Sequence, residues 1–222
     1  MKAMILAAGV GSRLRPLTDS TPKALVEVDG VPMLERVARR LIAAGVDGLI
    51  VNAHHLAEQV EAFIKSRKGF GIRCEISKEP VLLDTGGGLK KASWFFDDGK
   101  PFFLHNVDVV TELDLPAMYR AHDGLATLAV RERETTRALH FDGDILVPPG
   151  AGGKPLAFDG VHVISPAIFP KLTEDGVFSI IRAYWRLAEA GEAIRAFRSD
   201  PYEWHDIGSA AKLDKARRRR EA

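Results

Sequence analysis

Residues 3–18 read AMILAAGVGSRLRPLT, and this stretch indicates the fold of the whole chain. Its apolar beginning, Ala3–Ala8, is predicted to be a buried strand, and a glycine-rich turn follows at once. Such a turn is where α/β proteins bind phosphates, because small residues let backbone N–H groups approach the oxygens. The turn is not a dinucleotide fingerprint, since Leu14 stands at the third glycine position and Pro16 interrupts the next helix. It is not a Walker A loop either, because no Gly-Lys-Ser/Thr closes it.

Three cationic side chains lie in this turn or soon after it. Arg13, Arg15 and Lys23 belong to one short segment that Pro16 and Pro22 stiffen. Cations beside exposed backbone donors suit the phosphates of a nucleoside triphosphate. A strand-to-loop connection with solvated charges is the alternative that these residues alone leave open.

Strands and helices are predicted to alternate outward from this stretch. Strands are predicted at 48–52, 72–77, 102–106 and 126–130, and helices at 32–44, 56–66 and 113–122. A further helix, preceded by Gly86–Gly88, is predicted to run to about residue 96. This alternation is typical of an α/β fold with three layers, in which helices cover both faces of a mostly parallel, mixed sheet.

The pattern changes after residue 130. A hairpin is predicted at Leu139–Val147, with Asp142-Gly143-Asp144 as its turn. A strand at 156–164, a helix at 180–190, a strand at 194–197 and a closing helix at 210–220 follow. Residues 148–153 are interpreted as a surface loop and not a linker, so residues 1–222 are expected to form one domain.

Composition excludes several classes of protein. The net charge is +1, which gives no global field to attract nucleic acid or an anionic membrane. The single cysteine, Cys74, fits a reducing compartment. No apolar stretch approaches the length of a signal peptide core or a membrane span, so we expect a cytoplasmic protein without membrane or nucleic-acid partners. Arg217–Arg220 are expected to complement the dipole of the closing helix.

Residues 6–18, LAAGVGSRLRPLT, together with 21–26, TPKALV, resemble the signature of sugar-1-phosphate nucleotidyltransferases. The resemblance implies a Rossmann-like nucleotidyltransferase fold, with a nucleotide-binding part at about 1–125 and an acceptor-binding part at about 126–210. It also implies that Arg13 holds nucleotide phosphates, Arg15 steadies the pyrophosphate, and Lys23 bridges the α-phosphate and the sugar phosphate.

Two aspartates are candidate ligands for Mg²⁺. Asp108 follows the predicted strand Phe102–Asn106, and ligands sit at the carboxyl ends of strands in open α/β sheets. One or two carboxylates commonly hold Mg²⁺ together with phosphates. By resemblance Asp108 is the metal ligand of an Asn-Gly-Asp-like stretch in which Val107 replaces the glycine, and valine disfavours positive φ. The second ligand would be Asp206, in a stretch that resembles the family's Trp-x-Asp-Ile/Val-Gly-Thr/Ser.

The other site residues rest on the same resemblance. The segment 83–88, LDTGGG, is most similar to N-acetylmuramate-1-phosphate uridylyltransferases and next to mannose-1-phosphate guanylyltransferases. The residues expected to bind the nucleotide are Ala8, Gly9, Gly11, Ser12, Arg13, Lys23, Gly86 and Asn106. Those expected to bind the acceptor are Thr85, Gly87, Gly160 and Asp206. The segment Thr135–Phe141 matches no relative well and is expected to line the acceptor pocket.

The expected function is transfer of a nucleoside monophosphate from a nucleoside triphosphate to a phosphorylated sugar, in a monomer or small homo-oligomer. UTP with N-acetylmuramate 1-phosphate is the first expectation, and GTP with mannose 1-phosphate or another phosphorylated acceptor such as phosphocholine is an alternative. A silent nucleotide-sugar sensor is a further alternative. A zinc hydrolase is the last, because His105 and His205 flank the two aspartates.

Overall fold

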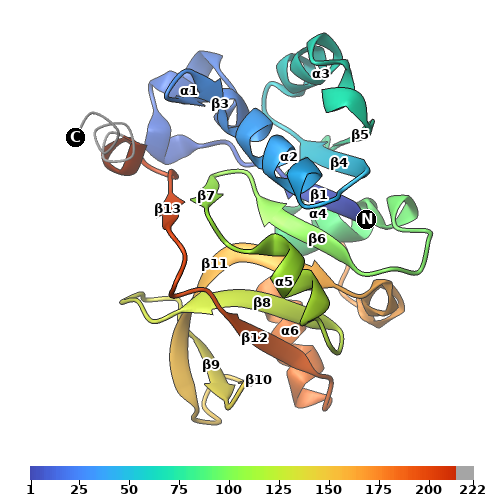
Figure 1. Ribbon diagram of the computed structural model, residues 1–222, viewed down its shortest axis with the longest axis vertical. Coiled ribbons are helices and arrows are strands. Elements are labelled where there is room, and N and C mark those ends of the chain that lie inside the picture. Colours follow the sequence, from blue (N-terminus) through green and yellow to red (C-terminus); the bar gives the residue numbers. More distant parts are fainter. Residues whose placement is uncertain (214–222) are drawn as a thin grey trace.

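The computed structural model describes residues 1–213 and is built on one nine-stranded mixed sheet (Figure 1). The strand order is β5-β4-β1-β6-β11-β8-β12-β10-β9. The strands are β1 Lys2–Leu6, β4 Gly48–Ala53, β5 Arg73–Lys78, β6 Phe102–Asn106, β8 Ala126–Arg131, β9 Leu139–Asp142, β10 Ile145–Val147, β11 Lys154–Ile164 and β12 Ile194–Arg198.

The central strands are continuous apolar runs, and their side chains are buried on both faces of this sheet. On β1, Ile5 packs into one apolar cluster and Met4 into a second cluster on the opposite face. Val51 and Ile50 on β4 divide in the same way. Successive side chains of a strand point to opposite faces, so a continuous apolar run requires cover on both sides.

Helices supply that cover. The helices are α1 Leu17–Ser20, α2 Met33–Ala43, α3 Ala57–Ser66, α4 Asp84–Lys91, α5 Leu115–Arg120 and α6 Ile180–Glu189. Apolar residues of α2, α3 and α5 join the cluster of Ile5, whereas those of α4 and α6 join the cluster of Met4. Figure 1 shows the same two layers, with α2 and α5 in front of the sheet and α4 and α6 behind it. The predicted three-layer α/β fold with a mixed sheet is therefore confirmed.

Strand direction divides the sheet into two parts. β5, β4, β1 and β6 run parallel to one another, as the βα alternation predicted. β11 is antiparallel to both β6 and β8, and it joins the two parts of the chain into one sheet. The predicted hairpin is confirmed as β9 and β10, which pair antiparallel around Gly143.

Two short ribbons were not predicted from the sequence. β7, Val109–Thr111, pairs antiparallel with β13, Trp204–Asp206, and β2, Glu27–Val28, pairs with β3, Val31–Pro32. Strands of two or three residues carry too little periodicity to be recognised. The β7–β13 ribbon holds together segments that are far apart in the sequence, and it leads into the site described below.

Most predicted helices and strands lie within a few residues of the observed ones. The exception is the segment 84–91, because Gly86–Gly88 lie inside α4 and do not merely precede it. Residues 210–213 begin the predicted closing helix, and the rest of that helix, with Arg217–Arg220, lies outside the described residues. Within residues 1–213, no helix is long and apolar enough to cross a membrane.

Two buried histidines make the stability of this fold depend on pH. His162 on β11 lies against Tyr184 of α6, with 3.0 Å between its Nδ1 and the tyrosine hydroxyl. Burial lowers the pKa of His162 to about 3 and that of His105 to about 4. In the unfolded chain a histidine has a pKa of about 6.5, so below that pH the unfolded state binds protons that the folded state does not.

We expect the free energy of unfolding to decrease as the pH is lowered below about 6.5, by about 1.4 kcal/mol per pH unit for each such histidine. His162→Gln removes one titrating group while it keeps a polar partner for Tyr184. Urea unfolding at several pH values should therefore give a shallower pH dependence for this variant than for the wild type. Equal slopes would contradict the assignment of His162 as neutral in the folded state.

Candidate active site

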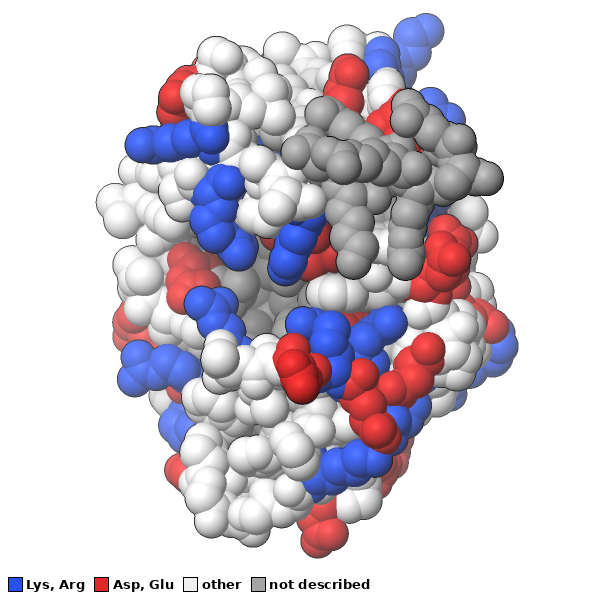
Figure 2. Space-filling view, turned by 90° about the vertical axis from the view of Figure 1, so that its left-hand side faces the viewer, with Lys and Arg blue, Asp and Glu red and all other residues white. Residues whose placement is uncertain are grey.

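A cavity of about 910 Å³ opens where the first loop, the end of β6 and the β7–β13 ribbon meet. Its walls include Arg13, Asn106, Asp108, Gly160 and Asp206. Figure 2 shows the molecule from the side on which β13 lies in Figure 1, and there the surface is hollowed, with Lys and Arg side chains around the hollow. The place agrees with the general rule that ligands of open α/β sheets bind beyond the carboxyl ends of the strands.

The two predicted metal ligands meet in this cavity. A Cβ built on Gly208 would lie 2.8 Å from Asp206 Oδ1, 3.1 Å from Asp108 Oδ2 and 2.9 Å from Arg13 Nη2. These three side chains therefore converge on the open space that the glycine leaves. The backbone N–H of Ile207 donates to the Asp108 carbonyl at 2.8 Å, which ties the two aspartates together through the ribbon.

Lysines compensate both carboxylates. Lys23, largely buried, donates to Asp108 Oδ2, and Lys212 donates to Asp206 Oδ2. Burial opposes the ionisation of Asp206, but the Lys212 hydrogen bond, the Gly208 N–H at 2.7 Å and the charge of Arg13 together lower its pKa. An ionised Asp206 beside a second carboxylate is a suitable ligand for a hard divalent cation.

The glycine-rich loop is held by contacts from three directions. Gly11 has φ 70°, and a Cβ there would lie 2.9 Å from Thr18 and 3.0 Å from Lys23. The buried Thr18 hydroxyl donates to the Gly11 carbonyl at 2.8 Å. Asn52 at the end of β4 accepts from the N–H of Ala7 at 2.7 Å. Glycine is therefore required at position 11 by conformation as well as by space.

The other nucleotide-binding candidates of this loop differ in exposure, and of these Arg13 lines the cavity. Ala8 is buried at the end of β1, whereas Gly9, Ser12 and Arg13 are exposed. Arg15 lies apart from the paired aspartates. Its side chain is exposed and forms an ion pair with Asp19 on α1, 3.2 Å from Nε to Oδ1. Its assignment to the pyrophosphate stays a prediction.

Gly86 and Gly87 allow α4 to pack against the segment that leads into α6. The N–H groups of Gly86 and Gly87 both donate to the carbonyl of Phe178, at 2.9 and 3.2 Å. A Cβ on Gly86 would lie 2.3 Å from the Phe178 ring, and one on Gly87 would lie 2.3 Å from the Gly176 carbonyl. Their contacts with nucleotide and acceptor stay predictions. Thr85 does line the cavity, and its hydroxyl also accepts from the N–H of Ile180 at 3.0 Å.

Gly160 brings β11 close to the end of β6. It has φ 82°, lies where the pairing of β11 with β8 shifts register, and a Cβ on it would lie 2.8 Å from Asn106 Nδ2. Val107, which stands where the family has a glycine, is buried and its φ is not positive. The valine is therefore accommodated without backbone strain, and Asp108 still reaches the cavity.

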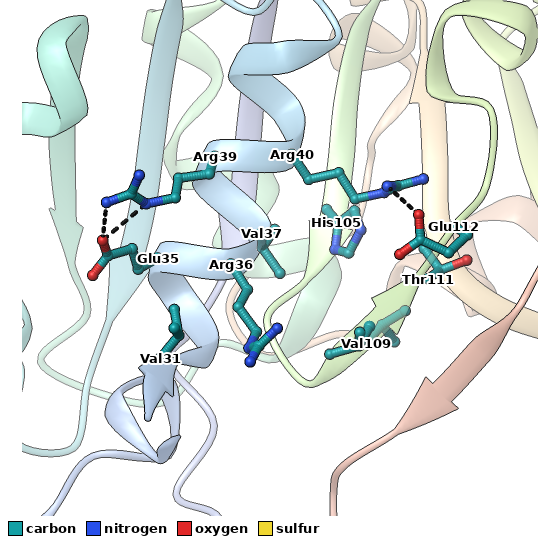
Figure 3. Close-up of a pocket in the computed structure, with 11 residues that line it drawn as sticks. Val31, Glu35, Arg36, Val37, Arg39, Arg40, His105, Val109, Thr111 and Glu112 are labelled. Atoms are coloured by element: carbon teal, nitrogen blue, oxygen red, sulfur yellow. Dashed lines mark hydrogen bonds and ion pairs between the residues drawn. The ribbon is translucent and has the colours of Figure 1, made fainter. Parts of the chain in front are cut away.

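His105, the histidine beside Asp108, does not line this cavity. His105 lines a second cavity of about 420 Å³ between α2 and β7, where Figure 3 shows it among Arg36, Arg40 and Val109. Within residues 1–213, no three His, Cys, Asp or Glu side chains lie close enough together to hold a metal ion. Because His105 lines the second cavity and Asp108 lines the first, a zinc centre built from both is disfavoured.

The structure adds residues that the sequence did not single out. Arg131 at the end of β8 donates to Asp159 at 2.5 Å, and Ser199 donates to the same oxygen at 2.6 Å. Trp204 donates through Nε1 to the Asp159 carbonyl at 2.9 Å. Burial raises the pKa of Asp159, while Ser199 and Arg131 oppose that rise. These contacts cross from β8 and β11 to β13, and no local pattern in the sequence signals them.

Comparison with known proteins places this site in a family. Residues 2–138 match the model of the nucleotidyl transferase family. The chain is 37% identical to the N-acetylmuramate alpha-1-phosphate uridylyltransferase of Caulobacter vibrioides, over 85% of each chain. It is 40% identical to the mannose-1-phosphate guanyltransferase of Gibberella zeae, over 60% of this chain and 38% of the relative. The chain belongs to the nucleotidyl transferase family and, within it, to the sugar-1-phosphate nucleotidyltransferases.

A solved structure shares the whole fold. The crystal structure of HddC from Yersinia pseudotuberculosis complexed with GMP-PN superposes with a TM-score of 0.79 at 21% identity, over 98% of each chain. At this level of identity the likeness concerns the arrangement of the elements. It supports the mixed α/β sheet with helices on both faces that the sequence predicted.

Gly208→Ala should reduce nucleotidyl transfer while the fold stays intact. The added methyl group would push against Asp206, Asp108 and Arg13 at once. Displacement of reacting groups by about 1 Å can cost up to about a hundredfold in rate. The measurement is kcat for nucleotidyl transfer, with the melting temperature as the control for folding. Full activity in the variant would show that the convergence of these three side chains is not required.

Proposed function

We propose that this chain transfers a nucleoside monophosphate from a nucleoside triphosphate to a sugar 1-phosphate, with Mg²⁺ as cofactor, and that UTP and N-acetylmuramate 1-phosphate are its substrates. The observation that carries the proposal is the convergence of Asp108, Asp206 and Arg13 beside the glycine-rich loop, with Lys23 on Asp108. Two carboxylates and two cations at one cavity suit a metal and two phosphorylated substrates.

The reaction needs alignment and charge neutralisation more than a base. A phosphate oxygen of the acceptor attacks the α-phosphorus, the bond from that phosphorus to the bridging oxygen breaks, and pyrophosphate leaves. A phosphomonoester has its second pKa near ~6, so the attacking oxygen is already ionised at neutral pH. Arg13 and Lys23 would hold two anions in place against their mutual repulsion. This chemistry requires neither a side-chain nucleophile nor a general base, and we assign no residue to either role.

The donor set at the cavity fits Mg²⁺. Asp108 and Asp206 offer carboxylate oxygens beside one open space, which is the ligand type that magnesium prefers. When bound, the metal would act as a template and as a Lewis acid toward phosphate oxygens. In the structure Lys23 and Lys212 compensate the charges of the two carboxylates. Entry of a divalent cation would therefore require these lysines to turn toward phosphate oxygens.

Relatives support the substrate assignment. The uridylyltransferase of C. vibrioides is matched over most of both chains, whereas the guanyltransferase of G. zeae is matched over 38% of its length. UTP with N-acetylmuramate 1-phosphate is therefore the first candidate pair, and GTP with mannose 1-phosphate is the second. The division into a nucleotide part at about 1–125 and an acceptor part at about 126–210 belongs to the same proposal.

A grid of substrates tests the proposed reaction. Pyrophosphate release is measured with Mg²⁺ for each nucleoside triphosphate against the 1-phosphates of N-acetylmuramate, N-acetylglucosamine, mannose and glucose, and against phosphocholine. We expect one dominant pair, UTP with N-acetylmuramate 1-phosphate, and loss of release when Mg²⁺ is chelated. Silence across the grid from folded protein that still binds a nucleotide would instead support the sensor.

Asp108→Asn and Asp206→Asn should each lower kcat by about a hundredfold or more, because each removes a charged ligand of the Mg²⁺ that would neutralise the reacting phosphates. The matched control is Asp142→Asn, an exposed carboxylate on the β9–β10 hairpin, which should retain wild-type activity. Titration of Mg²⁺ against rate should show a higher metal requirement in both site variants. A site variant as active as the control would overturn the assignment of that aspartate as a ligand.

A further inference from the structure

An acidic sugar places a demand on the acceptor site that a neutral sugar does not. N-acetylmuramate 1-phosphate, the acceptor proposed above, carries a carboxylate in addition to its phosphate, and N-acetylglucosamine 1-phosphate is the same sugar without that acidic side chain. Because Lys23 and Arg13 lie beside the paired aspartates, where phosphates are expected, the carboxylate needs a separate cationic partner. The inference below therefore rests on the proposed function.

The cavity wall contains arginines that form no ion pair with a carboxylate among residues 1–213, although the charge of one of them, Arg133, acts on Asp159. Arg133 and Arg137 lie on the segment between β8 and β9, and Arg182 lies in the first turn of α6, and all three line the cavity. Among the described residues, no carboxylate oxygen lies within 4.0 Å of these three guanidinium groups. The guanidinium groups of these three arginines can therefore bind an anion in the cavity. They belong to other segments of the chain than the predicted metal ligands Asp108 and Asp206.

Arg133 is held in place by an aromatic ring. Its guanidinium carbon lies 4.6 Å from the centroid of the Trp204 ring, and that of Arg131 lies 5.4 Å from the same centroid. Trp204 itself is fixed by its hydrogen bond to the Asp159 carbonyl and by its pairing with Thr111 in the ribbon. A guanidinium that stacks on a ring keeps its N–H groups free to bind an anion.

The two neighbouring arginines differ in what occupies their donors. Arg131 donates to Asp159 and to the carbonyl oxygens of Ser199 and Tyr202, so its hydrogen-bonding capacity is used within the protein. Arg133, two residues further along the chain, lies over the same ring and forms no ion pair or side-chain hydrogen bond with a carboxylate in the described part of the chain. Arg131 therefore serves the structure around Trp204, and Arg133 keeps N–H donors that can bind a ligand.

We propose that Arg133, together with Arg137 from the same segment, binds the carboxylate of the acceptor and so selects acidic sugar 1-phosphates over neutral ones. The arginine fork matches a carboxylate through two parallel N–H···O bonds, which gives orientation as well as attraction. Trp204 stands two residues before Asp206, so the carboxylate subsite and the metal ligand share one strand, β13. Binding at the subsite would thus set the position of the 1-phosphate relative to the metal.

The test compares two acceptors in matched variants. With UTP and Mg²⁺, Arg133→Gln should lower kcat/KM for N-acetylmuramate 1-phosphate by about tenfold to a hundredfold, mainly through KM. The same variant should change kcat/KM for N-acetylglucosamine 1-phosphate by no more than about twofold. Arg137→Gln should have a smaller effect in the same direction. Arg133→Lys should lie between the wild type and Arg133→Gln, because it keeps the charge and loses the fork.

Two further arginines serve as controls. Arg120→Gln removes an exposed arginine at the end of α5, away from the cavity lining, and should change neither acceptor. Arg182→Gln removes the same charge from the cavity wall formed by α6. Loss of discrimination in Arg182→Gln with none in Arg133→Gln would overturn the proposal and place the carboxylate on the α6 wall. Melting temperatures of all variants confirm that each is folded.

The outcomes separate this inference from the proposed function. A wild type that uses neither acceptor, or that prefers the neutral one, would contradict the proposed function itself. A wild type that prefers N-acetylmuramate 1-phosphate, with the same preference retained in Arg133→Gln and in the double variant with Arg137→Gln, would contradict the carboxylate subsite alone. Collapse of the preference in these variants, with turnover of the neutral acceptor maintained, supports both.

Discussion

The pairing of β7 with β13 is the constraint on which the site depends. The two strands are short, but their backbone hydrogen bonds bring Asp108 and Asp206 to the same open space beside Gly208. Two carboxylates at close range repel each other, and the structure offsets that repulsion with Lys23 and Lys212. Without the ribbon, the two aspartates would belong to separate loops and would not face the same space.

The large sheet gives this ribbon a rigid base. β1 and β6 are covered on both faces, so the loops at their carboxyl ends start from fixed positions. Gly11 allows the first loop to turn tightly against Thr18 and Lys23, and this contact sets Lys23 toward Asp108. Gly11 and Thr18 thus connect the packed core to the site. Through Lys23, the first loop also contacts the predicted metal ligand Asp108.

The two walls of the cavity carry different kinds of charge. Around the predicted metal ligands each carboxylate is paired with a lysine, Asp108 with Lys23 and Asp206 with Lys212. A bound metal would replace the lysines at the carboxylates, and the lysines could then contact phosphate oxygens. On the segment between β8 and β9, Arg133 and Arg137 form no ion pair with a carboxylate of the described residues, and Arg133 acts on Asp159 only through its charge. Trp204 connects the two regions, because it supports Arg133 and belongs to the strand that ends in Asp206.

The sequence by itself determined the layers of the fold and the residues of the first loop. The apolar runs in Ala3–Ala8 and Phe102–Asn106, and the resemblance carried by residues 6–26, depend only on residues near one another in the chain, so they can be recognised without a structure. Only the tertiary structure decided that Gly86 and Gly87 contact Phe178, that Arg15 pairs with Asp19, and that β7 pairs with β13. It also decided that Trp204 lies beneath Arg133. Each of these contacts joins side chains or backbone groups whose partners are set by packing and not by local pattern, and therefore no periodicity in the sequence records them.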